Sequence, residues 1–134
     1  MQSREAGFSL LELLVVLAIL ALLAGLVAPR VIGYLGGAKT DTAKMQLRNI
    51  ESALDLYRLD AGKYPQSLDA LVTQPAGVER WRGPYLKKAT GLSDPWGEPF
   101  KYRIPGQHGE YDLFSLGADK TEGGDGEDQD IKSW

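Results

Sequence analysis

Cysteine is absent from the 134 residues, and histidine occurs once, as His108. The lack of cysteine excludes disulfides, thiolate nucleophiles, Cys-ligated zinc and iron–sulfur clusters. A strongly basic field is also lacking, because 15 Lys and Arg face 18 Asp and Glu, for a formal charge of -3. We therefore expect no nucleic acid as a partner. The length allows one compact domain and is too short for a two-domain enzyme with its own cofactor fold.

A long apolar run lies near the N-terminus. Leu13 to Ala28 carries no polar side chain, and the run extends back to Phe8 with only two polar interruptions. A helix of roughly 21 residues at about 1.5 Å each is about 31 Å long, close to the hydrocarbon thickness of a bilayer. A cleaved secretory signal fits poorly, because the run lacks a clean small-x-small cleavage site. The segment is therefore expected to cross a membrane.

Glu12 lies inside this run. An acid in an apolar membrane helix costs on the order of 2 kcal/mol or more unless it is paired or lies near the interface. In a plain anchor, Glu12 would reach the lipid headgroups. The order of residues offers another explanation, because a short polar leader with Arg4 ends in Gly7, and Glu12 is fifth when Phe8 is counted as first.

Residues 7–16, Gly-Phe-Ser-Leu-Leu-Glu-Leu-Leu-Val-Val, resemble the cleavage and assembly motif of the type IV pilin superfamily. The resemblance implies that a prepilin peptidase removes residues 1–7 as a leader by cutting after Gly7, and that the new N-terminal Phe8 is methylated. The Glu12 carboxylate can then neutralise the terminal amine of a neighbouring helix. Glu12 would thus set the register of an assembly.

The expected membrane and assembly helix covers residues 8–34. Pro29 and three glycines (33, 36 and 37) weaken its later part and the residues that follow, because Pro removes a backbone donor and each interior Gly costs about 1 kcal/mol relative to Ala. This stretch is expected to bend or melt. Beyond it, apolar residues recur with spacings of four and three: Ala43, Leu47, Ile50, Leu54 and Tyr57. The spacing predicts a helix with one buried face that ends near Gly62.

Charged residues follow the same spacing on a neighbouring face of this helix: Lys44, Arg48, Glu51, Asp55 and Arg58. Such a stripe is ordinarily a solvated face. In a fibre, Glu51 and Asp55 could instead form ion pairs between subunits. Both interpretations remain open at this point.

The C-terminal half predicts a small antiparallel sheet. Apolar and basic residues alternate over residues 100–104, which is the period of a half-buried strand, and residues 111–116 predict a second strand. A tight turn is expected at residues 94–97 and a short amphipathic turn or helix near residues 68–71. The strand aromatics and Trp96 are interpreted as core. The fold class is therefore α+β, a long N-terminal helix packed on a small sheet.

A membrane-tethered hydrolase is the rival from another functional class. Only Ser115, His108 and Asp112 offer a nucleophile, a base and an orienting group. Ser115 and Asp112 are three residues apart on an expected strand, so they would face opposite sides, and His108 lies in the exposed connection before it. This geometry disfavours the hydrolase, and we expect no catalytic residues.

Residues 117–131 form an acidic, glycine-rich segment. By composition it would be a disordered tail. Ile131 and Trp134 argue against that, because an apolar pair after an acid run suits a packed segment. A calcium loop is the alternative, since calcium takes six to eight oxygen ligands, although the EF-hand spacing fails at Thr121. The acids are Asp119, Glu122, Asp125, Glu127, Asp128 and Asp130.

The second half of the chain resembles the major pseudopilin family of type II secretion systems, in four segments: residues 62–65 (Gly-Lys-Tyr-Pro), 83–86 (Gly-Pro-Tyr-Leu), 94–97 (Asp-Pro-Trp-Gly) and 109–119. The resemblance implies a pilin-like fold with residues 35–134 as a periplasmic domain. It also implies one calcium ion. The implied ligands are Asp119, Asp128 and the Leu116 carbonyl, with Asp125 and Asp130 in addition.

The same resemblance implies a structural subunit of a helical homopolymer. It is held in the inner membrane of a Gram-negative bacterium by its lipid-embedded helix and then assembled into a periplasmic fibre that drives export of folded proteins across the outer membrane. Implied partners are prepilin peptidase, minor pseudopilins and an inner-membrane assembly platform. A type IV pilus subunit for attachment or DNA uptake is the alternative, which the lack of cysteine and of a basic patch disfavours.

Overall fold

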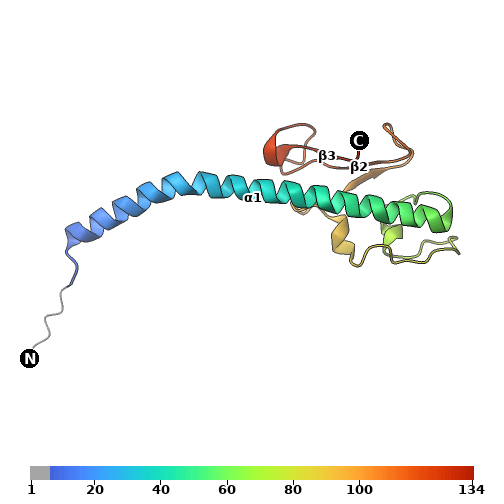
Figure 1. Cartoon of the computed structure of the whole chain (residues 1–134), viewed down its shortest axis with the longest axis horizontal. Coiled ribbons are helices and arrows are strands. Elements are labelled where there is room, and N and C mark those ends of the chain that lie inside the picture. The colour runs from blue at the N-terminus through green and yellow to red at the C-terminus, as the bar shows by residue number, and fades with distance from the viewer. Residues whose placement is uncertain (1–6) are drawn as a thin grey trace, which may run out of the picture. The chain divides into compact units, whose positions relative to one another are not determined.

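A computed structural model describes residues 7–134, so residues 1–6 of the expected leader lie outside the described residues. The chain divides into two compact units, Met1–Leu35 and Gly36–Trp134. Helix α1 (Leu10–Ala61, 52 residues) belongs to both of them. Figure 1 shows its later part beside strands β2 and β3.

Local chemistry defines both ends of α1. At its start, the Ser9 hydroxyl accepts the backbone N–H of Glu12 at 3.1 Å, which is an N-cap. At its end, Gly62 adopts a φ of +83° and its N–H donates to the Arg58 carbonyl at 2.7 Å. A left-handed residue is easiest for glycine, so the predicted end near Gly62 is confirmed.

The expected melting near Pro29 is not seen, because α1 is one unbroken helix through Pro29, Gly33, Gly36 and Gly37. Proline and glycine lower helix stability by removing a hydrogen bond or adding backbone freedom. The backbone hydrogen bonds of the helical residues before and after each of them offset this loss of helix stability. The stretch is therefore weak in composition but helical in this structure.

The buried face of α1 confirms the predicted stripe and extends it. All five predicted residues, from Ala43 to Tyr57, are buried. The same spacing continues towards the N-terminus through Thr40 to Gly36, which are buried as well. The sequence did not predict these two, because Gly and Thr carry no apolar signal. The predicted charged face is exposed except for half-buried Glu51.

A three-stranded antiparallel sheet has the order β1 (Lys101–Arg103), β2 (Asp112–Ser115) and β3 (Ile131–Lys132). The first two strands lie where the sequence placed them but are shorter. Strand β3 was not predicted, because two residues show no alternation and pairing with β2 alone defines them. Within residues 7–134, three short 3₁₀ helices complete the structure: η1 (Leu68–Leu71), η2 (Ala89–Leu92) and η3 (Gly126–Asp128).

The core lies between the later part of α1 and one face of this sheet. Leu113 and Ile131 are buried on the sheet side, next to Ile50 and Leu54 of the helix in the same cluster. Phe100 is buried, and Tyr102 and Trp96 pack partly buried against this cluster. Phe100, Tyr102 and Trp96 are thus part of the core, as predicted, whereas Phe114 lies outside this cluster.

The register separates two faces of the sheet. Phe114 pairs with Lys101 on one side and Lys132 on the other, so these three share a face. Leu113 and Ser115 point to the opposite face, because side chains alternate along a strand. Asp112 and Ser115 therefore face opposite sides, as expected from their spacing.

Candidate functional site

The first unit presents an apolar helix without protein cover. The side chain of Phe8 is 82% exposed, and the large apolar residues of α1 up to Leu35 are all exposed. By length and composition, the described chain contains one helix apolar enough to cross a membrane, and its apolar window is not buried at all. An uncovered surface of this kind needs lipid or other protein around it.

Glu12 lies in the first turn of α1, where an acid interacts favourably with the positive end of the helix dipole. Its own N–H is capped by Ser9. The Ser-x-x-Glu signature at residues 9–12 could have revealed this helix start from the sequence. The structure therefore adds a local role for Glu12 to the predicted role in assembly.

The acidic segment is a folded loop. The Ala118 N–H donates to the Glu127 carbonyl at 2.8 Å, which closes residues 118–127 on themselves. Gly117 has a φ of +77°, and a Cβ there would collide with backbone oxygens of Glu127 and Gln129. Lys120 Nζ lies 3.0 Å from Glu98 Oε1, which ties the loop to the preceding turn. The segment is thus not built as a solvated tail.

The predicted calcium ligands lie on this loop and, for Leu116, just before it, but their carboxylates do not gather into one cluster. Over residues 7–134, the structure gathers no group of three or more His, Cys, Asp or Glu side chains that could hold a metal. Asp119 accepts the N–H and the hydroxyl of Thr121, at 3.1 and 2.7 Å. Asp130 Oδ2 accepts the Gly123 N–H at 3.0 Å, and its Oδ1 is buried without a hydrogen-bond partner.

This donor set nevertheless fits a hard cation. Every predicted ligand offers oxygen, the element that calcium prefers. A buried carboxylate oxygen without a partner is costly, and a cation would satisfy it. The orphaned Asp130 Oδ1 is therefore the structural feature of the loop that fits the predicted calcium.

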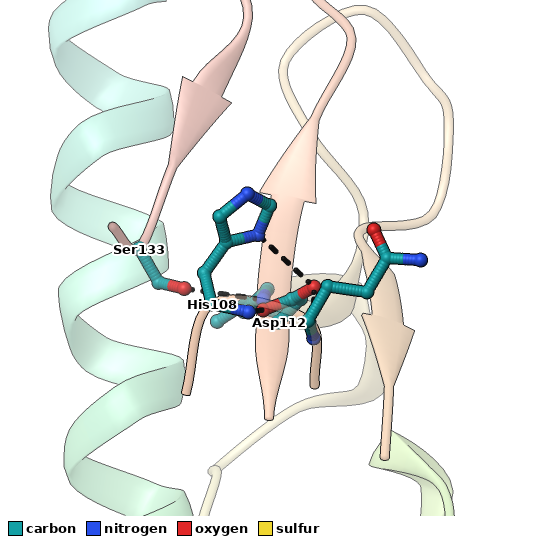
Figure 2. A network of polar contacts seen from close by, with 5 residues as sticks. His108, Asp112 and Ser133 are labelled. Carbon is teal, nitrogen blue, oxygen red and sulfur yellow. Dashed lines mark hydrogen bonds and ion pairs between the residues drawn. The ribbon is translucent and has the colours of Figure 1, made fainter. Parts of the chain in front are cut away.

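His108, Asp112 and Ser133 belong to a polar network at the end of the sheet, shown in Figure 2. Asp112 is fully buried and accepts the backbone N–H groups of Gln107 (2.9 Å) and His108 (3.1 Å). The His108 Nδ1 lies 3.3 Å from Asp112 Oδ2. Ser133 accepts the Leu113 N–H at 3.2 Å and returns its own N–H to the Leu113 carbonyl at 2.9 Å. The network fastens the C-terminal residues to β2.

Ser115 does not join this network. It is 1% exposed, and its hydroxyl donates to Asp94 Oδ2 at 2.7 Å. The other oxygen of Asp94 accepts the N–H groups of Trp96 and Glu98, at 3.1 and 2.9 Å. Asp94 thus organises the predicted turn and holds Ser115. Its position two residues before Trp96 is the sequence signal of an Asx turn, which sequence reasoning did not use.

The charged face of α1 is partly engaged within the chain. Arg58 lies 3.1 Å from Glu110 and donates to the Tyr64 hydroxyl at 3.2 Å, and that hydroxyl donates to Asp55 at 3.1 Å. Burial, followed by the nearby Asp55 charge, raises the pKa of Glu51 above its ordinary value. The stripe is therefore neither wholly solvated nor free of internal partners.

Two family models match the chain. The one described as "Type II secretion system (T2SS), protein G" covers residues 30–134, and the one described as "Prokaryotic N-terminal methylation motif" covers residues 2–28. Together they span the membrane-type helix and the folded unit. The second match includes Gly7, Phe8 and Glu12, the three residues that the sequence singled out.

Similar proteins carry the same description. The Pseudomonas aeruginosa type II secretion system core protein G is 46% identical over 142 residues, covering 100% of this chain and 99% of that protein. The Xanthomonas campestris protein of that name is 43% identical over 128 residues, covering 96% and 89%. The crystal structure of the major pseudopilin of enterohaemorrhagic Escherichia coli is 33% identical with a TM-score of 0.62, covering 77% of this chain and 92% of that one. The chain therefore belongs to the type II secretion system protein G family and is a pseudopilus subunit of such a system.

Proposed function

We propose that this chain is held in the inner membrane by α1 and, after cleavage behind Gly7 and methylation of Phe8, is extracted into a periplasmic fibre. Growth of the fibre would move folded proteins through an outer-membrane channel. The observation that carries the proposal is that only the part of α1 from Gly36 onwards is buried by its own chain. The exposed apolar part has to be covered by lipid before assembly and by other copies afterwards.

The proposed role is mechanical and needs no catalytic group. Ser115 is committed to Asp94, and His108 lies against Asp112. The sequence has no G-x-x-x-x-G-K-[ST] phosphate loop, so the force would come from a separate ATPase. Minor pseudopilins and an inner-membrane assembly platform are the further proposed partners.

Glu12 provides the test of the assembly proposal. Glu12→Ala should still be cleaved and methylated, because the cleavage site is intact, but should assemble poorly, because the amine of a neighbouring Phe8 loses its counter-charge. Mass spectrometry would follow processing, and electron microscopy of sheared fibres would follow assembly. Asp41→Ala, at an exposed acid of α1 outside the apolar part, serves as the control for both processing and assembly. Normal fibre yield from Glu12→Ala would refute the register role.

We further propose that the acidic loop binds one calcium ion. Asp130, with its unpartnered Oδ1, would hold it together with Asp119, Asp125, Asp128 and the Leu116 carbonyl. When bound, calcium supplies charge neutralisation for six crowded acids and so stabilises the folded loop.

Thermal unfolding of the full chain in detergent, with calcium, magnesium or a chelator, tests this proposal. A ligand at a hundred times its dissociation constant adds about 2.7 kcal/mol to the stability of the folded state. Calcium should raise the midpoint and magnesium should not. Asp130→Asn should abolish the rise, whereas the matched change Glu122→Gln should leave most of it. Equal midpoints with calcium and chelator would refute the calcium site.

A further inference from the structure

The buried stripe of α1 begins with small residues, whose side chains gain little hydrophobic free energy from burial. Gly36 is buried, Thr40 is 8% exposed and Ala43 is fully buried. The Thr40 hydroxyl donates to the Gly36 carbonyl at 3.1 Å, so it makes its bond within the helix. Small side chains allow another segment to approach the helix backbone closely.

The segment that covers Gly36 is the acidic loop. A Cβ placed at Gly36 would overlap the Glu127 side chain, including its Cγ and its carboxyl carbon. The neighbouring Gly37 has nothing within 4 Å of its Cβ position. Glu127 therefore lies directly on the helix backbone, in a space that exists only because residue 36 is glycine. The two residues are 91 positions apart in the chain.

The loop backbone holds Glu127 in this position. Its carbonyl accepts the Ala118 N–H at 2.8 Å, and it lies in the centre of η3. Asp128 N–H donates to the Asp125 carbonyl at 3.1 Å, which closes that turn. The contact with Gly36 is made by the Glu127 side chain from Cγ outward, and the folded loop backbone sets the position from which that side chain reaches the helix.

We propose that the acidic loop, residues 117–131, is a strap that closes on α1 through Glu127 and Gly36. Gly36 is the first residue of the folded unit, and the helix is weak there, because two glycines adjoin. When the strap is closed, it holds the helix at residues 36–40. When the loop opens, Glu127 no longer covers Gly36, and the helical hydrogen bonds of residues 36–40 open more readily. By linkage, loosening the helix there opens the loop to the same extent.

Hydrogen exchange of the full chain in detergent tests the strap at its contact point. Gly36→Ala removes a weak helix former but forces Glu127 away, so exchange should rise roughly tenfold in both residues 36–44 and residues 117–131. Gly37→Ala is the matched control. It has open space for its Cβ, so exchange in both segments should stay constant or slow. Equal behaviour of the two variants would overturn the proposal.

A double-mutant cycle separates the strap from a general folding defect. Glu127→Ala alone should speed exchange at residues 36–44, whereas Glu122→Ala on the same loop should not. In the Glu127→Ala background, Gly36→Ala should slow exchange at residues 36–44, because the overlap is gone and Ala favours a helix. Effects of Gly36→Ala that are the same with and without Glu127 would overturn the strap, even if Gly36→Ala alone folds poorly.

The strap does not depend on the ion proposed for the loop. If calcium leaves exchange unchanged but the cycle shows coupling, the strap stands and the calcium site fails. If calcium protects residues 117–131 without protecting residues 36–44, the loop and the helix are uncoupled and the strap fails. Glu127→Gln, which keeps the shape and removes the charge, should preserve the protection, because the contact is one of packing.

Discussion

The imidazole of His108 stacks on the indole of Trp134, with ring centroids 4.1 Å apart and ring planes 5° apart. The indole also meets the Phe114 ring edge-on at 5.8 Å, and Lys132 Nζ lies 5.4 Å from its centroid. These contacts join the loop before β2 to the last residue of the chain. The acidic loop lies between these two segments in sequence, so its C-terminal end is held in place by them.

Trp134→Ala should therefore destabilise the fold. Aromatic pairs contribute about 0.5–1.5 kcal/mol each beyond buried area, and Trp134 takes part in two ring contacts. We expect a loss of about 1–2 kcal/mol in the free energy of unfolding, measured by denaturant titration of the full chain in detergent. Trp134→Phe should recover part of it. A stability unchanged by Trp134→Ala would show that the stack does not contribute to stability.

Asp112 should make the fold sensitive to acid. Burial alone would raise its pKa, but the hydrogen bonds from the Gln107 and His108 backbone and the His108 ring outweigh burial, so its pKa lies below its ordinary value. An acid with a lower pKa in the folded state stabilises the fold above its unfolded pKa of about 3.9, and this stabilisation is lost as pH falls through the folded value.

The expected result is a thermal midpoint that falls as the pH is lowered from about 4 towards 2. Asp112→Asn should lower the midpoint at pH 7 and flatten this acid dependence. Asp41→Asn, an exposed position on α1, is the matched control. An acid profile of Asp112→Asn parallel to that of the parent chain would contradict the prediction.

Asp94 and Ser115 should differ in how much they stabilise the fold. Ser115→Ala removes two hydrogen bonds, one to the buried Asp94 carboxylate and one from the Gly117 N–H at 3.3 Å, and should cost about 1–3 kcal/mol. Asp94→Ala removes three hydrogen bonds and leaves two backbone N–H groups without that acceptor, so it should cost more. Urea unfolding of both variants checks the order. A larger loss for Ser115→Ala would mean that Asp94 does not organise the turn.

A substitution at Glu51 should distinguish an effect on folding from an effect on assembly. Its carboxylate is half-buried and repelled by Asp55, so Glu51→Gln should leave the thermal midpoint of the monomer unchanged or slightly higher. If Glu51 forms an ion pair with another subunit, fibre yield should fall at the same time. Asp41→Asn again serves as the control. A normal yield of salt-stable fibres from Glu51→Gln would leave the charged face without a role in assembly.

Sequence periodicity predicted much of the fold because it reports local preference. The recurrence of Ala43, Leu47 and Ile50 identifies the buried face of α1, and Gly62 identifies its end. The motif around Gly7, Phe8 and Glu12 likewise lies in one continuous segment. Such features are readable because the residues that act together are also close in the chain.

Other features could not be read in this way. Strand β3 has only two residues, and its pairing with β2 defines it. The hydroxyl of Ser115 reaches Asp94, not the His108 that sequence reasoning considered with it. Each of these depends on chain segments that meet only after folding.

The sequence by itself determined that a long apolar helix carries an acid near its start, continues as a half-buried helix and is followed by a small sheet and an acidic loop. Hydrophobic spacing and motif order suffice for this, since both act over a few turns of chain. Only the tertiary structure decided that the buried stripe begins at Gly36 and that Glu127 covers it. Glycine has no side chain with which to signal burial, so its environment depends on which distant segment packs against it.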